Sequence, residues 1–220
     1  CGMEAVGDAA NVLVIYGDTP LLTPQTLSKM LTNHRQSGAT MTVATFENPS
    51  PTGYGRIVRE APAAPGSPQS GAGRVLGRVM GIVEEADASD EQKELTEVNA
   101  GMCVVKTEAL VGALSRLTPH NKQGELYLTD IVADLAGRGE TVEAYLMADA
   151  IEASGINTRF QLATLEEVAL TRMRQRWMDR GVSMQDPGSI RIDADVDIGE
   201  DTLLGPNVQL LGKTRIGAGC

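Results

Sequence analysis

The stretch Val12-Leu13-Val14-Ile15-Tyr16-Gly17-Asp18-Thr19-Pro20 decides how the rest of the chain is interpreted. Four consecutive apolar residues, mostly β-branched, predict a strand buried on both faces, as in the centre of a parallel α/β sheet. The apolar run stops at Gly17, and Asp18 follows at once. Ligands of open α/β sheets bind beyond the carboxyl ends of the strands, so Asp18 is a candidate ligand for a hard cation such as Mg²⁺. On spacing alone, Asp18 could equally begin a turn before Pro20.

Helix and strand patterns alternate after this stretch. Thr23-Pro24 predicts the start of a helix that closes at Gly38, and His34 ends its apolar stripe as a surface or core residue rather than a ligand. Ser89 and Gln92 predict a capping box, Thr107 a helix cap, and Asn157 the cap of a long helix to about Arg180. Strands are expected at 40–45, 56–59, 75–83, 98–105 and 141–147.

Composition limits the class of protein. The 220 residues suffice for one sizeable domain and part of another, and the net charge of −10 argues against broad binding of nucleic acid or anionic membranes. Cys1, Cys103 and Cys220 lie far apart and predict neither a zinc site nor a disulfide framework, so a reducing, cytoplasmic setting is expected. No stretch is apolar enough to span a membrane. The chain starts at Cys1 with no capped element before the first strand, which suggests a fragment.

Several polar segments between the strands are weaker candidates for binding. Pro51–Ile57 carries two glycines around Tyr54, a common loop pattern that usually binds nothing. The residues Glu125, Tyr127, Thr129 and Asp130 are compatible with helix caps and solvated positions. The Ala-, Pro-, Gly- and Ser-rich segment 61–73 is expected to be a mobile hairpin tip.

The C-terminal part of the chain has a period of six. Aliphatic residues recur at Ile192, Ile198, Leu204, Leu210 and Ile216, and glycines follow three of them directly. Neither the helical period nor a hairpin produces this spacing. It is typical of a hexapeptide β-helix, in which the aliphatic side chain points into the coil.

An α/β domain, a long helix and a hexapeptide β-helix in this order resemble the bacterial bifunctional N-acetylglucosamine-1-phosphate uridylyltransferase/glucosamine-1-phosphate N-acetyltransferase family. The resemblance covers almost all 220 residues. It rests on YGDTPL (16–21), PTGYGRIVRE (51–60), GIVEEADASDEQ (81–92), EVNAGM (97–102), GELYLTDI (124–131) and GINTRFQL (155–162).

The resemblance implies a fold and a division into domains. Residues 1–159 would form a Rossmann-like nucleotide-diphospho-sugar transferase domain without its N-terminal part. Residues 160–180 would form a linker helix, and residues 181–220 would begin the left-handed β-helix of the acetyltransferase domain.

It also implies site residues. The metal ligands for Mg²⁺ would be Asp18 and Asn157, with no catalytic protein nucleophile. The residues lining the nucleotide-sugar site would be Tyr16, Gly17, Gly55, Glu84, Asn99 and, as a further segment, Tyr127 and Thr129.

The implied reaction is attack by N-acetylglucosamine 1-phosphate on the α-phosphorus of UTP, which gives UDP-N-acetylglucosamine and pyrophosphate for peptidoglycan and lipopolysaccharide precursors. In the family, a homotrimeric β-helix transfers acetyl groups from acetyl-CoA to glucosamine 1-phosphate. The family's glycine-rich nucleotide loop, its uracil-reading segment and the acetyl-CoA site have no counterpart here, so these 220 residues alone are expected to be inactive.

Two other interpretations stay open. One is another sugar-1-phosphate nucleotidyltransferase, adenylyl or thymidylyl, with a β-helix tail. The other is a non-catalytic trimerising module that keeps the fold.

Overall fold

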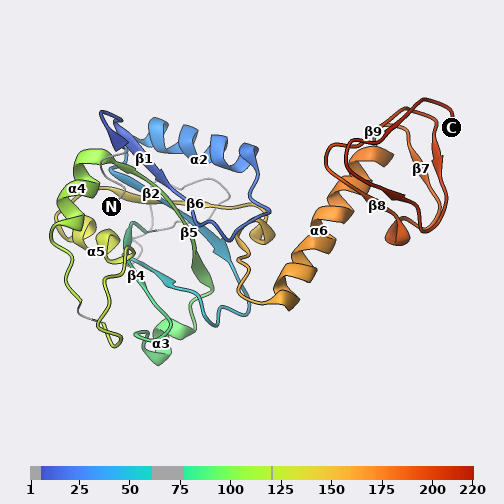
Figure 1. Cartoon of the computed structure of the whole chain (residues 1–220). Coiled ribbons are helices and arrows are strands. Elements are labelled where there is room, and N and C mark those ends of the chain that lie inside the picture. Colours follow the sequence, from blue (N-terminus) through green and yellow to red (C-terminus); the bar gives the residue numbers. More distant parts are fainter. Residues whose placement is uncertain (1–5, 61–76, 120) are drawn as a thin grey trace. The chain divides into compact units, whose positions relative to one another are not determined.

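The computed structural model describes residues 6–60, 77–119 and 121–220. The chain clusters into two units, Cys1–Ser154 and Gly155–Cys220, named here the first and the second unit (Figure 1). The hairpin tip expected at 61–73 lies outside the described residues.

A six-stranded mixed sheet is the centre of the first unit. Its strands are β1 (Asn11–Val14), β2 (Met41–Glu47), β3 (Arg56–Arg59), β4 (Val79–Val83), β5 (Glu97–Lys106) and β6 (Val142–Leu146). They follow the order β4-β3-β5-β2-β6, and β1 pairs with β5 beside this path. Among the described pairs, β2 and β6 are parallel and the others are antiparallel.

The strand buried on both faces is β5. Val98, Ala100, Met102 and Val104 point to one core, while Cys103 and Val105 point to the other. Partners on both edges and helices on both faces account for this burial. The prediction that residues 12–15 form the central strand of a parallel sheet is therefore wrong for the described structure. β1 is antiparallel to β5, its other edge has no partner among the described residues, and its side chains are half-buried.

Helices cover both faces of this sheet (Figure 1). On one face, α2 (Pro24–Ser37) and the short 3-10 helix η1 (Ala150–Ala153) pack through Met30 and Ala153. On the other face, the apolar residues come from α4 (Thr107–Leu114) and α5 (Asp130–Gly137). The result is a three-layer α/β/α arrangement.

Two of the three predicted helix caps in the first unit are confirmed. The Thr23 hydroxyl accepts from the Thr26 N–H at 3.2 Å, and Gly38 ends α2 in the left-handed region. Ser89 forms a capping box with Gln92 at the start of α3 (Asp90–Lys93). Thr107 is not a cap. It is the first residue of α4, and its hydroxyl donates instead to the carbonyl of Ala9.

The second unit begins with the long helix α6 (Arg159–Met178). Its N-cap is Thr158, not the predicted Asn157. The Thr158 hydroxyl accepts from the Gln161 N–H at 3.1 Å, and the Gln161 side chain accepts from the Thr158 N–H at 2.9 Å. This reciprocal capping box outcompetes the neighbouring asparagine. No helix in the described part of the chain is long and apolar enough to cross a membrane.

After α6 the chain coils through two-residue strands. These are β7 (Ser183–Met184), β8 (Arg191–Ile192), β9 (Asp197–Ile198), β10 (Leu203–Leu204), β11 (Gln209–Leu210) and β12 (Arg215–Ile216), with the 3-10 helix η2 (Pro187–Ser189) after β7. Parallel pairs join Arg191 to Gln209 and Asp197 to Arg215, so one turn takes eighteen residues. The first turn is longer, because Ser183 pairs with Leu203.

The aliphatic residues predicted from the six-residue period point into this coil. Ile192, Ile198, Leu204 and Leu210 are buried, and Trp177 at the end of α6 packs on the same core. Buried Arg174 also ties α6 to the coil, because its guanidinium donates to the carbonyl of Ile190 at 2.7 Å.

Candidate functional site

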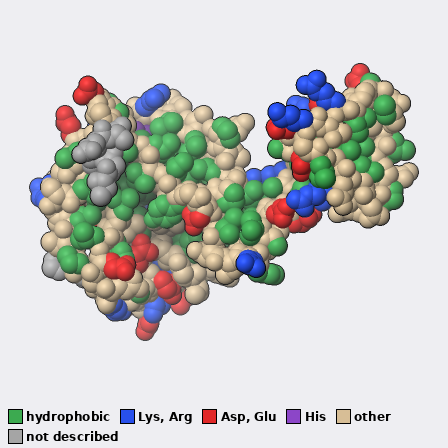
Figure 2. All heavy atoms as spheres, viewed as in Figure 1, with side chains coloured by type: hydrophobic (Ala, Val, Ile, Leu, Met, Phe, Trp, Pro, Cys, Tyr) green, Lys and Arg blue, Asp and Glu red, His purple; other side chains and the backbone are tan. Residues whose placement is uncertain are grey.

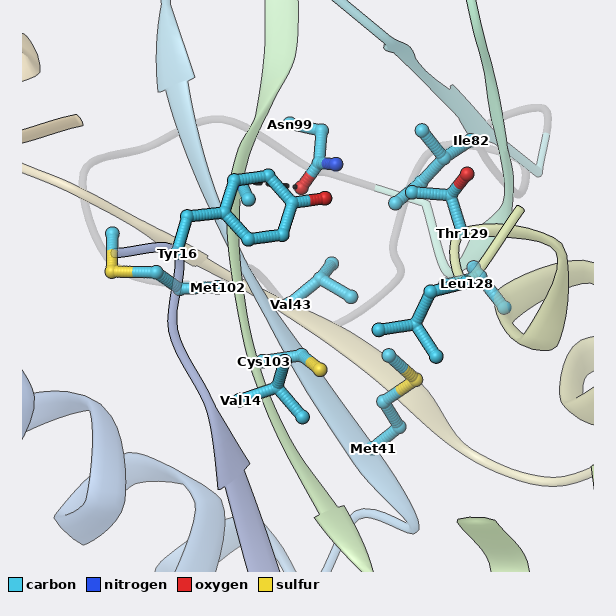
Figure 3. Close-up of a pocket in the computed structure, with 12 residues that line it drawn as sticks. Val14, Tyr16, Met41, Val43, Ile82, Asn99, Met102, Cys103, Leu128 and Thr129 are labelled. Atoms are coloured by element: carbon cyan, nitrogen blue, oxygen red, sulfur yellow. Dashed lines mark hydrogen bonds between the residues drawn. The ribbon is translucent and has the colours of Figure 1, made fainter. Parts of the chain in front are cut away.

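The candidate site lies along one edge of β5. β2 occupies the other edge, from Glu97 to Val105. On the site edge, β1 pairs beside the C-terminal half of β5, and β3 begins opposite Val98 at its N-terminal end. Between β1 and β3 lies a pocket, shown in Figure 3. It is lined by Val14, Tyr16, Met41, Val43, Ile82, Asn99, Gly101, Met102, Cys103, Leu128, Thr129 and Val132.

The pocket has an apolar floor and a polar rim. Tyr16, Asn99 and Thr129 carry the polar groups of the lining, and Tyr16 is 46% exposed, whereas Met41 and Cys103 are buried. Burial raises the pKa of the Cys103 thiol to about 12, so this thiol stays protonated at neutral pH. The cavity volume is only about 20 Å³, so a ligand larger than a water molecule would contact the rim rather than fill the floor.

The sequence motifs do not point to the residues of the pocket floor. The floor residues have the pattern of ordinary core positions, because they alternate along their strands with residues that face the opposite core. They are Met41 and Val43 of β2 and Cys103 of β5. Their alternation identifies their shared face, but nothing in the pattern marks that face as reaching a pocket.

Tyr16 is held against the backbone of β5. Gly101 has φ +73°, and a Cβ there would lie 2.4 Å from Cδ2 of the Tyr16 ring. The Asn99 side-chain oxygen accepts from the Gly101 N–H at 3.0 Å. Burial, reinforced by the nearby Glu84 carboxylate, raises the pKa of Tyr16, so its phenol is a neutral hydrogen-bond donor.

Gly55, Glu84, Asn99 and Thr129 are brought together beside this ring. The Asn99 N–H donates to the Gly55 carbonyl at 2.8 Å, and the Thr129 hydroxyl donates to Glu84 Oε1 at 2.9 Å. A Cβ on Gly55 would lie 3.1 Å from Glu84 Oε2, so the glycine lets this carboxylate approach the backbone. Four of the residues implied by the family resemblance therefore form one connected group.

Tyr127 lies in a neighbouring hollow instead. This hollow includes Glu84, Asp87 and Asp130 in its lining, and the Tyr127 hydroxyl donates to Gln123 Oε1 at 2.7 Å. Burial and the Asp87 carboxylate raise the pKa of Asp130. Glu84 thus borders both hollows: it lines this one and accepts from Thr129 of the other.

The two predicted metal ligands belong to different units. Gly17 and Asp18 are exposed just beyond β1, where the Thr19 hydroxyl donates to the Tyr16 carbonyl at 3.1 Å. Asn157 is exposed at the start of the second unit, and its N–H donates to Gln161 Oε1 at 2.8 Å. Whether Asp18 and Asn157 share one cation stays a prediction. Within the described residues, no three His, Cys, Asp or Glu side chains gather in a way that could hold a metal.

Acidic side chains are prominent on one face of the first unit. Figure 2 shows carboxylates gathered over the region of α3, whose first turn carries Asp90 and Glu91. A phosphorylated ligand that approaches such a surface needs positive charge at its binding site.

Comparisons with known proteins agree with this fold. The model of MobA-like NTP transferase domains matches residues 1–119. The bifunctional protein GlmU of Heliobacterium modesticaldum is 42% identical over 217 residues, 99% of this chain and 44% of that protein. GlmU of Mycobacterium tuberculosis is 42% identical over 222 residues, 100% of this chain and 42% of the relative.

Among solved structures, a Bacillus anthracis protein assigned as a glucose-1-phosphate thymidylyltransferase, in complex with sucrose, aligns with a TM-score of 0.52. The identity is 16%, over 76% of this chain and 57% of that chain, so the likeness is one of fold. The chain spans less than half the length of the GlmU relatives it matches. Because the family model covers more than half of the chain, this protein belongs to the MobA-like NTP transferase domain family and, along its whole length, is similar to the bifunctional GlmU proteins.

Proposed function

We propose that the complete protein transfers UMP from UTP to N-acetylglucosamine 1-phosphate and releases pyrophosphate. The supporting observation is the connected group of Gly55, Glu84, Asn99 and Thr129 beside Tyr16, in a chain of the NTP transferase family. A sugar requires several short polar groups around an apolar contact surface, and this group supplies both.

Each residue has a role that its surroundings suggest. Tyr16 offers a ring face and a neutral hydroxyl, and Asn99 offers an amide fixed by its bond to the Gly101 N–H. Glu84 keeps one oxygen on Thr129 and turns the other toward the space over Gly55, where a sugar hydroxyl could donate. Catalysis by this chain would consist of orienting the attacking phosphate.

The proposed cofactor is Mg²⁺, held by Asp18 and Asn157. Carboxylate and amide oxygens are hard ligands, and Mg²⁺ usually takes only one or two carboxylates from the protein and its other ligands from phosphates and water. Both side chains are exposed and thus accessible to a hydrated ion. When bound, Mg²⁺ neutralises charge on the phosphates.

For the C-terminal part, we propose the start of a left-handed hexapeptide β-helix. Its inward aliphatic residues and eighteen-residue turns support this. The corresponding domains would be a uridylyltransferase part at 1–159, a linker helix at 160–180 and a β-helix from 181. In the complete protein, this β-helix would form a homotrimer and acetylate glucosamine 1-phosphate with acetyl-CoA. Since the reaction consumes UTP, the proposed location is the cytoplasm.

The test is pyrophosphate release by the full-length protein with Mg²⁺, N-acetylglucosamine 1-phosphate and each of UTP, ATP and dTTP. We expect release with UTP, its loss on chelation of Mg²⁺, and its loss in Asp18→Asn while acetyl transfer continues. Preference for ATP or dTTP would favour the adenylyl or thymidylyl alternative. Absence of release with every nucleotide would contradict the proposal.

A further inference from the structure

We propose that the ion pair between Arg56 and Glu85 is a clamp that positions the sugar-binding residues Gly55 and Glu84. The inference rests on the proposed function, because it assigns a positioning role beside the residues proposed to hold N-acetylglucosamine. Neither Arg56 nor Glu85 lines the pocket beside Tyr16.

The clamp joins the residues that directly follow Gly55 and Glu84 in the chain. Arg56 Nη2 lies 2.7 Å from Glu85 Oε2, and the Arg56 side chain is only 2% exposed. Nη1 of Arg56 donates to the Tyr54 carbonyl, and the Gly53 N–H donates to Glu85 Oε2 at 3.3 Å. One carboxylate therefore holds the Arg56 guanidinium and the backbone of the glycine loop together.

The Arg56–Glu85 contact lies at the end of the hydrogen-bonded ladder between β3 and β4. The antiparallel register of β3 and β4 begins at Arg56 opposite Val83, and beyond it no ladder pair holds the two strands. Gly55 and Glu84 are the next residues on each side. Charge-assisted hydrogen bonds are shorter and stronger than neutral ones, so the Glu85–Arg56 pair can replace the missing ladder.

The electrostatics suit a permanent contact. The hydrogen bond from Arg56 holds the pKa of Glu85 below its usual range, so Glu85 stays ionised at neutral pH. Arg56 Nε is buried without a hydrogen-bond partner in the described structure, which leaves the charge of the guanidinium to be balanced through its Nη groups. A buried guanidinium is costly without such a partner, so the pair is held in one geometry.

Loss of the clamp should weaken binding of the sugar phosphate and leave binding of the nucleotide unchanged. The Gly55 carbonyl bonds to the Asn99 N–H, and Glu84 Oε2 lies against Gly55, so movement of the loop would displace three proposed sugar contacts together. Asp18, proposed to hold the Mg²⁺ on the phosphates, follows β1 and lies outside this loop. The expected signature is a raised KM for N-acetylglucosamine 1-phosphate with an unchanged KM for UTP.

The main test uses the double variant Arg56→Met/Glu85→Leu in the full-length protein. Removing both charges leaves no buried charge unpaired, so the variant should fold where Arg56→Met or Glu85→Gln alone could fail. We expect KM for N-acetylglucosamine 1-phosphate, and Kd for UDP-N-acetylglucosamine by calorimetry, to rise by about tenfold or more.

The matched control is the double variant Arg59→Met/Glu97→Gln, which also removes both charges of one ion pair. Arg59 lies on the same strand and pairs with Glu97 at 2.6 Å, at the far end of β3 from the loop. This control should lower the unfolding temperature without changing either KM. Unchanged sugar affinity in the double variant would overturn the clamp alone. An equal rise in the control would also overturn it, because general loosening of the sheet would then suffice. A wild-type protein without uridylyl transfer would overturn the proposed function and, with it, this inference.

Discussion

Gly101 fixes the position of the Tyr16 ring, and its replacement should show this directly. Gly101→Ala places a methyl group 2.4 Å from the ring on a backbone with φ +73°. Gly139 has φ +81° with nothing within 4 Å, so Gly139→Ala measures the backbone strain alone. We expect about 1–2 kcal/mol of lost stability for Gly139→Ala and roughly 1–3 kcal/mol more for Gly101→Ala, by denaturant unfolding. Equal losses would mean that the ring moves freely.

His34 should make stability depend on pH. The side chain is buried, with Nδ1 2.9 Å from the Thr42 hydroxyl and Nε2 3.2 Å from Asn11 Oδ1. Burial, with the positive charge of Lys106, lowers its pKa. The unfolded chain takes up the proton near pH 6.5, so the stabilisation from neutral His34 is complete above about pH 6.5 and is lost as the pH falls below it.

The check is a comparison of the wild type with His34→Gln. Between about pH 7 and about pH 5, the free energy of unfolding should fall more steeply in the wild type than in the variant. Parallel curves would show that folding leaves the pKa of His34 unchanged.

At the residue scale, the sequence predicts which residues belong to the site better than it predicts their hydrogen-bond partners. Gly55, Glu84, Asn99 and Thr129 could be named from motifs, but not the hydrogen bonds that join them. Such bonds connect residues far apart in the chain, and no local pattern encodes them. Asn157 shows the same limit, because it and Thr158 are both good caps and only the position of Gln161 decides between them.

At the scale of elements, the stability of α2 depends on its N-cap residue. Thr23 caps the helix, and its N–H and hydroxyl both donate to the buried Glu152 carboxylate at 3.0 Å. Thr23→Ala should lower the free energy of unfolding by about 1–2 kcal/mol. Ser89→Ala removes the exposed cap of the short helix α3 and should cost about 0.5 kcal/mol, the low end of the range for lost caps. Equal losses in thermal or denaturant unfolding would contradict the role of Glu152.

Two equivalent glycines of the coil should respond differently to alanine. Gly199 and Gly205 each follow an inward aliphatic residue, but a Cβ on Gly199 would lie 2.3 Å from the Ala218 nitrogen, while Gly205 has nothing within 4 Å. Gly199→Ala should cost roughly 2 kcal/mol or more, because backbone must move. Gly205→Ala should stay within about 0.5 kcal/mol. Faster amide exchange of Gly199, which donates to the Ile216 carbonyl, would accompany the first change only.

Element positions were largely predictable, but element surroundings were not. Apolar alternation and capping residues predicted β2, β3, β5, α2 and α6 close to their observed bounds. The apolar run that predicted a central strand forms β1, and β1 pairs with only one strand, β5, in the described structure. A run of Val, Leu and Ile indicates that these side chains favour a buried strand. Whether the strand is buried on both faces depends on neighbouring elements, which the run does not specify.

At the scale of the whole chain, the two units should unfold in separate steps. Each has its own apolar core, and the single tryptophan, Trp177, is buried in the core of the second unit. Tryptophan fluorescence should therefore follow the second unit, and far-ultraviolet circular dichroism should follow both. Different denaturant midpoints for the two signals are expected, and coincident midpoints would mean that the units unfold together.

Because one turn of the coil takes eighteen residues, the coil should tolerate insertions or deletions of a whole turn but not of single residues within a strand. Arg191 stacks on Gln209 and Asp197 on Arg215, and each inward aliphatic residue stands at a fixed place in its hexad. Deleting one residue in a strand would move every later aliphatic side chain outward. Adding or removing eighteen residues would restore every pairing. Homologues should therefore differ in this region by whole turns, and shorter insertions should occur only where they can loop out at a corner.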